Sequence, residues 1–313
     1  MSRAFVFPGQ GSQAVGMGRA LAEAFPVAAH LFEEVDEALK QKLSTLMFEG
    51  PADELTLTEN AQPALMAVSL AVLAVLESEG GLSLPGACSL VAGHSLGEYS
   101  ALAAARAIPV ETTARLLRTR GRAMQKAVPV GEGAMAALMG LDLDAVRDIA
   151  ATAAEDQVCE AANDNAPGQV VVSGHRAAVE RAIAIGEQRG ARRAILLPVS
   201  APFHCALMAP AAAVMAEALE AVEIAPPAVP IVTNVSAKPE DDPARIRGLL
   251  VEQVTATVRW REDVLAMKEA GVETLVELGS GRVLSGLARR IDRDLTGQAV
   301  GTLDEIESFL KSA

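Results

Sequence analysis

A serine framed by two glycines is the residue with the clearest chemical potential. Ser95 lies at the centre of a G-x-S-x-G pattern at 93–97, after the apolar stretch 89–92 and before the alanine-rich stretch 98–107. A strand, a tight turn and a helix in this order form a nucleophile elbow, which exposes the serine hydroxyl and points the helix N-terminus at a developing oxyanion. The two glycines lack the Cβ atoms that would clash where the backbones meet. The pattern predicts a serine nucleophile; the alternative is a surface turn.

A serine hydroxyl needs a general base at neutral pH, and the chain has four histidines. His94 precedes the serine in the turn, so its side chain is expected to point away from it. His30 lies in a helical pattern, and His175 follows a predicted strand. His204 lies in the irregular segment 200–205, at a predicted domain junction where catalytic residues are common. We expect His204 to be the base; the alternative is a core histidine held by one backbone contact.

The imidazole of such a base also needs a partner that fixes its orientation. A triad would use a carboxylate, and Asp263 and Glu277 are candidates, although neither lies in a recognisable motif. A backbone carbonyl would orient the ring equally well and give a dyad. Both alternatives stay open at this point.

Four arginines lie on the predicted helix 111–126 with no acidic residue between them. Helical spacing places Arg115, Arg118 and Arg122 on one side and Arg120 elsewhere. We expect the first three to form a solvated face, which leaves one arginine free to face inward. A buried arginine beside a serine nucleophile would bind a substrate carboxylate through two hydrogen bonds.

Composition and charge argue against several classes of function. The chain has 313 residues, half of them hydrophobic, and a formal net charge of -13. The negative charge argues against nucleic acid as a partner. The three cysteines are widely spaced, which favours reduced thiols over a disulfide framework or a zinc site. The glycine motifs at 9–11 and 279–281 do not continue as G-x-G-x-x-G, so no nucleotide cofactor is predicted; the first turn could instead serve an oxyanion hole.

Neither a membrane span nor a signal peptide is predicted. The longest apolar run, 64–76, is shorter than the roughly 20 residues that a bilayer span needs, so it indicates a buried helix. The N-terminal segment reaches Pro8 too soon for a signal peptide. We expect a soluble, cytoplasmic protein.

The order of predicted elements indicates an α/β protein with an insertion. Residues 1–128 and 200–313 alternate strands and helices, which predicts a discontinuous α/β-hydrolase-like domain with a parallel sheet. Residues 129–199 follow the β-α-β-β-α-β order of a ferredoxin-like subdomain. The expected strands are 4–7, 89–92, 134–140, 158–162, 169–173, 194–199, 231–233 and 274–278. The expected helices are 18–39, 64–76, 98–107, 111–126, 143–154, 177–189, 208–222, 245–254, 260–270 and 283–291.

Nearly the whole chain resembles one family, the malonyl-CoA:acyl carrier protein transacylases of bacterial fatty-acid synthesis. Each matching motif is modest, but together they occur in the family's order. The motifs are 7–13, 93–99, Arg120-Gly121 with Met124, 163–169, 200–204 and Gln253.

The resemblance implies a ping-pong acyl transfer. Ser95 would be acylated by malonyl-CoA, and His204 would be its base. The thiol of the phosphopantetheine group on acyl carrier protein would then take the malonyl group from the serine. Arg120 would hold the malonyl carboxylate, and no cofactor is implied.

The resemblance also implies supporting roles for five residues. Gln10 and Leu96 would donate backbone N–H groups to the oxyanion, and the main-chain carbonyl of Gln253 would orient the histidine. Phe203 would exclude an α-methyl branch, and Asn165 would belong to the substrate-binding residues.

A basic surface is expected to attract the acidic carrier protein. We expect Arg189, Arg192 and Arg193 to contribute to it. Two other hypotheses stay open: a serine hydrolase that shares the elbow, and a carrier-binding subunit without catalytic activity.

Overall fold

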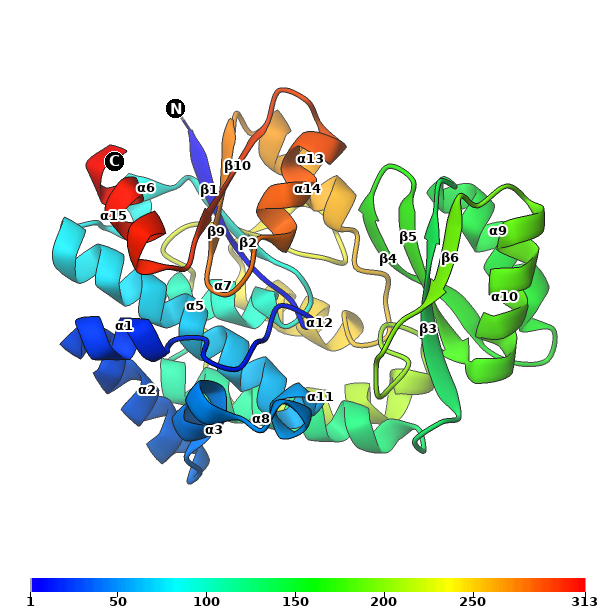
Figure 1. Cartoon of the computed structure of the whole chain (residues 1–313), viewed down its shortest axis with the longest axis horizontal. Helices are drawn as coiled ribbons and strands as arrows, with labels where there is room; N and C mark the ends of the chain where they lie inside the picture. Colours follow the sequence, from blue (N-terminus) through cyan, green and yellow to red (C-terminus); the bar gives the residue numbers. More distant parts are fainter. Residues whose placement is uncertain (1, 313) are drawn as a thin grey trace.

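The computed structural model describes residues 2–312, which form two lobes (Figure 1). The large lobe contains six strands and most of the helices, and the small lobe contains four strands and two helices. The strands of the large lobe are β1 (Arg3–Phe7), β2 (Leu90–Gly93), β7 (Ile231–Val232), β8 (Pro239–Glu240), β9 (Thr274–Leu278) and β10 (Thr296–Val300). Its helices are α1 (Arg19–Ala24), α2 (Pro26–Leu39), α3 (Leu43–Glu49), α4 (Ala52–Thr56), α5 (Thr58–Gly80), α6 (Leu84–Ala87), α7 (Gly97–Ala104), α8 (Val110–Ala127), the short 3-10 helix η1 (Ala206–Met208), α11 (Ala209–Glu220), α12 (Pro243–Glu252), α13 (Trp260–Glu269), α14 (Val283–Ile291) and α15 (Leu303–Ser312).

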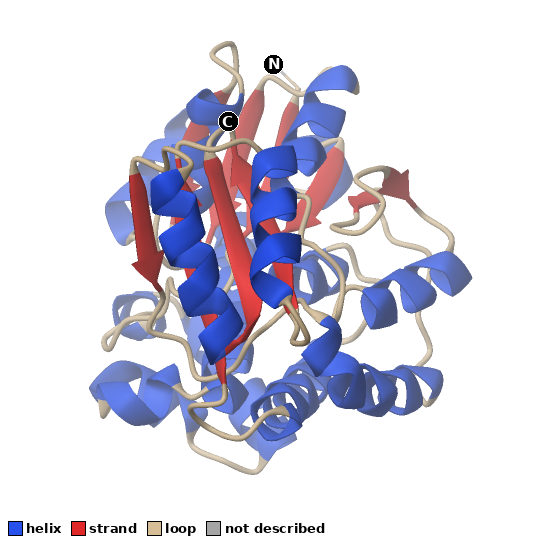
Figure 2. Cartoon of the chain, turned by 90° about the vertical axis from the view of Figure 1, so that its right-hand side faces the viewer, coloured by secondary structure: helices blue, strands red, loops and turns tan. Residues whose placement is uncertain are grey.

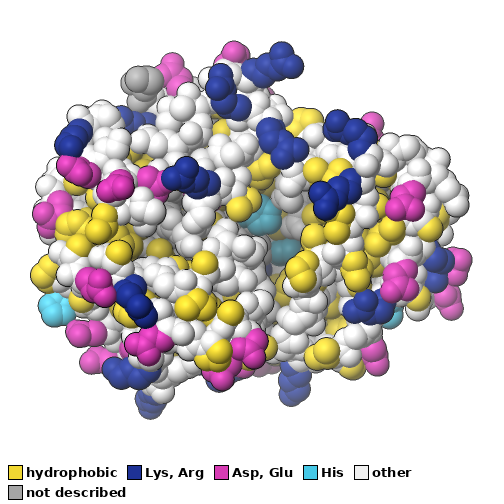
Figure 3. Space-filling model, viewed as in Figure 1, with side chains coloured by type: hydrophobic (Ala, Val, Ile, Leu, Met, Phe, Trp, Pro, Cys, Tyr) yellow, Lys and Arg dark blue, Asp and Glu magenta, His cyan; other side chains and the backbone are white. Residues whose placement is uncertain are grey.

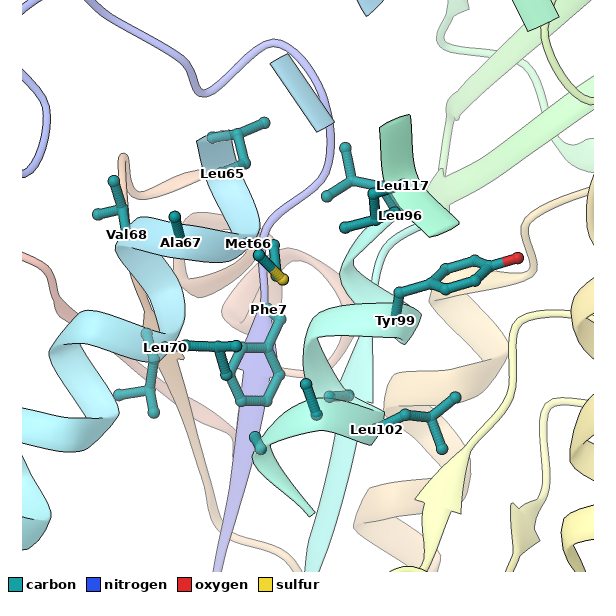
Figure 4. Packing of buried hydrophobic residues seen from close by; sticks show 14 of the residues in the cluster. Phe7, Leu65, Met66, Ala67, Val68, Leu70, Leu96, Tyr99, Leu102 and Leu117 are labelled. Atoms are coloured by element: carbon teal, nitrogen blue, oxygen red, sulfur yellow. The ribbon is translucent and has the colours of Figure 1, made fainter. Parts of the chain in front are cut away.

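The large sheet has the order β10-β9-β1-β2-β7-β8 and is parallel except for the last pair. Alternate residues of the central strand β1 enter opposite layers, as the strand period requires. Figure 4 shows Phe7 packed against α5 and α7, and Phe5 belongs to the same cluster. Ala4 and Val6 pack instead with α13 and α14. The sheet is therefore covered by helices on both faces. In such folds, ligands bind in the loops at the carboxyl ends of the strands.

Helix α5 is the centre of the larger hydrophobic core. Its 23 residues include an 18-residue window with a mean hydropathy of 1.6, so by length and composition alone it is apolar enough to cross a membrane. In the fold 83% of that window is buried, which identifies it as a core helix. The expectation of a buried helix is confirmed, but the length argument was wrong, because the helix extends well beyond 64–76.

The small lobe holds an antiparallel sheet of order β4-β5-β3-β6. Along the chain its elements are β3 (Gly133–Met139), α9 (Leu143–Ala154), β4 (Cys159–Ala166), β5 (Gln169–His175), α10 (Arg176–Gln188) and β6 (Arg193–Leu196). Figure 2 shows both helices in front of this sheet, on the face that points away from the large lobe. The observed order of strands and helices is the one predicted, and α9 has the predicted bounds. Backbone bonds between Val258 and β4 join the two lobes.

Several predicted bounds differ from the structure for local reasons. The helix expected over 18–39 is two helices, because Phe25 is extended and Pro26 starts the second. The strand expected over 194–199 ends at Leu196, two residues before Pro198, which has no N–H for a ladder bond. The helices α3, α4, α6, η1 and α15 and the strands β8 and β10 were not predicted.

Candidate active site

The nucleophile elbow forms as the sequence predicts. Ser95 follows β2, has a φ of 54° in the left-handed region, and directly precedes the turn into α7. A Cβ on Gly93 would lie 1.9 Å from the carbonyl carbon of Gly97, and a Cβ on Gly97 would lie 2.2 Å from the carbonyl oxygen of Phe7. Only glycine fits at either position, so the close packing of strand and helix holds the strained serine in place.

Ser95 and His204 meet although 109 positions separate them in the chain. Ser95 Oγ lies 2.8 Å from His204 Nε2, and His204 Nδ1 lies 2.9 Å from the main-chain oxygen of Gln253. A carbonyl oxygen only accepts hydrogen bonds, so Nδ1 carries the proton and Nε2 is free to accept one from the serine. Burial, and then the positive charge of Arg120, lower the pKa of His204 to about 3. The imidazole is therefore neutral and able to act as a base at physiological pH.

The two carboxylates considered as orienting partners lie elsewhere. Asp263 accepts a hydrogen bond from the side chain of Asn234 at 2.9 Å, and Glu277 accepts from the backbone N–H groups of Leu284 and Ser285 at the start of α14. The open question is thus answered by a backbone carbonyl. The histidine and serine form a dyad, and no acidic side chain among residues 2–312 bonds to the ring.

Arg120 is the arginine that faces inward. It is 1% exposed, and its Nη2 donates to Ser95 Oγ at 3.1 Å and to the side-chain oxygen of Gln253 at 2.8 Å. Its Nη1 donates to the side-chain oxygen of Gln62 at 2.9 Å, and its guanidinium lies over the ring of Tyr99. Every acceptor is neutral, so within residues 2–312 the guanidinium forms no ion pair, although the charge of Glu98 acts on it without a hydrogen bond. This is the state expected of a group that receives an anionic substrate.

One of the three arginines assigned to a solvated face is buried instead. Arg118 is 7% exposed, and its Nε donates to the backbone carbonyl of Glu59 at 2.9 Å. That carbonyl is available because Pro63, four residues later in α5, has no N–H to bond to it. Arg115 and Arg122 are exposed, as predicted.

A cavity of about 580 Å³ lies between the lobes, with Ser95, His204 and Arg120 in its lining. Figure 3 shows a hollow at this position with histidine atoms at its bottom. Phe203 also lines it, together with Gln10 and Leu96, whose backbone N–H groups donate to no acceptor among residues 2–312. The remaining lining residues are Gly9, Gly11, Ser12, Gln13, Thr56, Gln62, His94, Met124, Met135, Asn163, Asn165, Gln169, Val171, Leu197, Pro198, Val199, Val283, Leu284 and Leu287.

His94 was expected to point away from the serine, but it lines the same cavity. Its Nε2 lies 2.8 Å from the side-chain oxygen of Asn165 on β4. Burial lowers the pKa of His94, so the ring is neutral and fits a hydrogen bond to an amide. This pair crosses the gap between the lobes and places Asn165 beside the serine's own turn.

Three further polar residues around the serine were not predicted. Asn234 follows β7, and its side-chain oxygen accepts from the backbone N–H of Ser95 at 2.8 Å. Glu98 is buried in the first turn of α7, and Gln62 holds the guanidinium as described above. Asn234 and Gln62 lie in no recognised motif, and Glu98 lies in the motif 93–99 without an assigned role. Only the position of Asn234 at a strand's carboxyl end gave a signal for it.

Comparisons with known proteins identify the relatives of this chain. Residues 4–290 match the family model described as acyl transferase domain. The chain is 47% identical over 310 residues to a malonyl CoA-acyl carrier protein transacylase of Bacillus subtilis, covering 99% of this chain and 96% of that protein. A crystal structure of an acyl-carrier-protein S-malonyltransferase from Bartonella henselae superposes with a TM-score of 0.97 at 58% identity, covering 100% of this chain and 99% of that one.

A solved complex is also similar to this chain. It contains a type II polyketide acyl carrier protein with its malonyl-transacylase, and the matched chain gives a TM-score of 0.96 at 44% identity with full coverage of both chains. Among residues 2–312, no group of three or more histidine, cysteine, aspartate or glutamate side chains has the geometry of a metal site.

Proposed function

This chain belongs to the acyl transferase family, among the malonyl CoA-acyl carrier protein transacylases, and from that premise we propose that it moves a malonyl group from malonyl-CoA to the thiol of a carrier protein. The pathway is fatty-acid or polyketide synthesis. The observation that carries the proposal is the contact of Ser95 Oγ with both His204 Nε2 and Arg120 Nη2, at 2.8 and 3.1 Å. A nucleophile, its base and a carboxylate-binding cation thereby share one cavity.

The first half of the reaction acylates the serine. His204 Nε2 takes the proton from Ser95 Oγ as the oxygen attacks the thioester carbonyl. The backbone N–H groups of Gln10 and Leu96 stabilise the oxyanion, aided by the N-terminus of α7. The carbon–sulfur bond then breaks, the imidazolium returns the proton to the leaving thiolate, and coenzyme A departs. A malonyl-serine ester remains.

The second half reverses these roles. The phosphopantetheine thiol of acyl carrier protein gives its proton to His204 and attacks the ester carbonyl. The collapse of the second tetrahedral intermediate returns the proton to Ser95 Oγ and releases the malonyl thioester. Because His204 is neutral in the resting state, it can accept a proton in both halves.

Selectivity for malonyl follows from the lining of the cavity. The Arg120 guanidinium would bind the substrate carboxylate in place of its bond to Ser95 Oγ. Phe203 occupies the wall beside the histidine and would crowd a branch on the α carbon. Asn165 fixes His94 in the same wall.

The carrier protein would dock on the small lobe beside the cavity. Arg192 and Arg193 are exposed and form no ion pair within residues 2–312, and the strand that carries Arg193 leads directly to the lining residue Leu197. Arg189 pairs with Asp148, so its charge is partly neutralised. Figure 3 shows basic side chains on both sides of the hollow, which suits an acidic partner.

The remaining proposals concern architecture and setting. Residues 129–199 would be a ferredoxin-like subdomain, supported by the strand order β4-β5-β3-β6, inserted into an α/β-hydrolase-like domain made of 1–128 and 200–313. The reaction needs no cofactor, because every proton transfer has a residue to perform it. The protein would act in the cytoplasm, without nucleic acid or membrane partners.

Intact-mass spectrometry after mixing with malonyl-CoA tests the proposed function. The wild-type protein should gain one malonyl group, and Ser95→Ala should gain none. An unmodified wild-type protein would instead support a carrier-binding subunit without activity. Release of free malonate in place of a stable adduct, with carrier protein present, would support a hydrolase.

A further inference from the structure

Glu98 is a buried carboxylate that the reaction scheme does not use. It is 1% exposed, lies in the first turn of α7 three residues after the serine, and forms no ion pair among residues 2–312. Burial raises its pKa to about 7. A carboxyl group buried at such a desolvation cost needs hydrogen-bond donors, and Glu98 has two.

Both partners donate to the same oxygen of Glu98. Gln253 Nε2 lies 2.7 Å from Glu98 Oε2, and the backbone N–H of Asn234 lies 3.2 Å from it. The same Nε2 also lies 2.9 Å from the main-chain oxygen of Ser95. The Gln253 amide nitrogen is thus surrounded by acceptors, and this fixes which end of the amide points toward them.

The other end of that amide faces the guanidinium. Gln253 Oε1 accepts from Arg120 Nη2 at 2.8 Å, while the main-chain oxygen of Gln253 accepts from His204 Nδ1 at 2.9 Å. One fully buried glutamine therefore orients both the carboxylate-binding cation and the base. If the amide turned over, it would direct N–H groups at Arg120 and displace the guanidinium.

We propose that Glu98 is a positioning residue, which holds the Gln253 amide so that Arg120 is aimed at the malonyl carboxylate. This inference rests on the proposed function. Glu98 contributes the acceptor that Gln253 needs at a defined distance, rather than a charge that reaches the substrate. Its loss should therefore affect malonyl substrates, which use Arg120, more than acetyl substrates, which do not.

Two near-isosteric variants separate the acceptor from the charge. Glu98→Gln can place its amide oxygen where Oε2 lies and keep both hydrogen bonds without the charge. Glu98→Asp keeps the charge but withdraws the acceptor by one methylene. Asp36→Ala is the control: this buried carboxylate binds Ser44 at the start of α3, away from the cavity lining.

The measurement is the single-turnover rate of serine acylation with malonyl-CoA and with acetyl-CoA, together with the thermal midpoint. Glu98→Asp should lower the malonyl rate about tenfold to a hundredfold, as expected for a misplaced binding group, and should reduce the malonyl-to-acetyl ratio. Glu98→Gln should retain most of the malonyl rate and most of the malonyl-to-acetyl ratio. Asp36→Ala should lower the thermal midpoint but leave the malonyl-to-acetyl ratio unchanged.

Two results would overturn this proposal while the wild type is still acylated. One is an unchanged malonyl-to-acetyl ratio in Glu98→Asp, which would make Glu98 merely structural. The other is a larger loss in Glu98→Gln than in Glu98→Asp, which would assign the effect to charge. A wild type that malonyl-CoA does not acylate would remove both this inference and the proposed function.

Discussion

Replacing Arg120 by alanine should remove the preference for malonyl over acetyl thioesters. The guanidinium is 1% exposed, reaches Ser95 Oγ at 3.1 Å, and has only neutral acceptors around it. The substrate carboxylate would be the first anion to accept a hydrogen bond from it directly. Acetyl-CoA has no such group, so it gains nothing from Arg120.

The expected size of the effect follows from the burial of the pair. Truncating one partner of a buried, hydrogen-bonded charge pair costs about 2–5 kcal/mol. Since each 1.36 kcal/mol is tenfold in rate, kcat/KM for malonyl-CoA should fall about 30-fold to about 5000-fold. Arg120→Ala also leaves the side-chain oxygens of Gln62 and Gln253 without this donor, which lowers the free energy of unfolding by about 1–3 kcal/mol for each oxygen. This loss of stability is the same whichever substrate is assayed.

The assay is kcat/KM for malonyl-CoA and acetyl-CoA with one carrier protein. Arg118→Ala is a matched control, because Arg118 is also buried on α8 but bonds to the Glu59 carbonyl outside the cavity lining. It should lose stability and keep the substrate ratio. An equal fall for malonyl-CoA and acetyl-CoA in Arg120→Ala would refute the assignment of Arg120 to the carboxylate.

Three further predictions address the elbow, the base and the docking surface. Gly93→Ala should prevent folding or sharply lower the thermal midpoint, because its Cβ would lie 1.9 Å from a backbone carbon. The control Gly248→Ala has open space around its Cβ and should be neutral or stabilising. Equal thermal midpoints for the two variants would contradict this prediction. The pKa of His204 is lowered to about 3 in the folded protein, below its value of about 6.5 in the unfolded chain. The folded state therefore holds a neutral ring and is most stable above about pH 6.5. That stability is lost as the pH falls toward 3, because the unfolded chain binds a proton that the folded protein does not. In Glu98→Gln, which lacks the other buried group with a pKa near 7, acylation rates from pH 5 to 8 should therefore show no step near 6.5, and a step there would contradict a neutral base. Arg192→Glu with Arg193→Glu should raise KM for the carrier protein and spare acylation by malonyl-CoA; equal loss in both half-reactions would count against docking there.

Local sequence patterns predicted the parts of the fold that local forces determine. The observed bounds of α9, β9 and α14 are those predicted, because the two helices have a periodic apolar pattern and β9 is a short buried run that ends before Gly279. Strand β10 was missed because it lies at the sheet edge, contains Gly297 and has only Val300 fully buried. The helices α3 and α4 have seven and five residues, too few for a period to show.

The site shows the same division between local and long-range causes. The elbow around Ser95 could be predicted because its two glycines and the flanking strand and helix are adjacent in the chain. The contact of Asn165 with His94 could not be derived from the histidine's place in the turn, because it forms between the lobes. Arg118 was misplaced because its burial depends on a carbonyl freed by Pro63 on another helix.

The proposed transfer is tested by following a labelled malonyl group through both half-reactions. The protein is loaded with labelled malonyl-CoA, freed of coenzyme A and unreacted substrate, and mixed with carrier protein that carries phosphopantetheine. The label should leave Ser95 and appear as a thioester on the carrier, and carrier protein without the prosthetic group should receive none. Label that stays on the serine, leaves as free malonate, or reaches the carrier only while malonyl-CoA is present would contradict it.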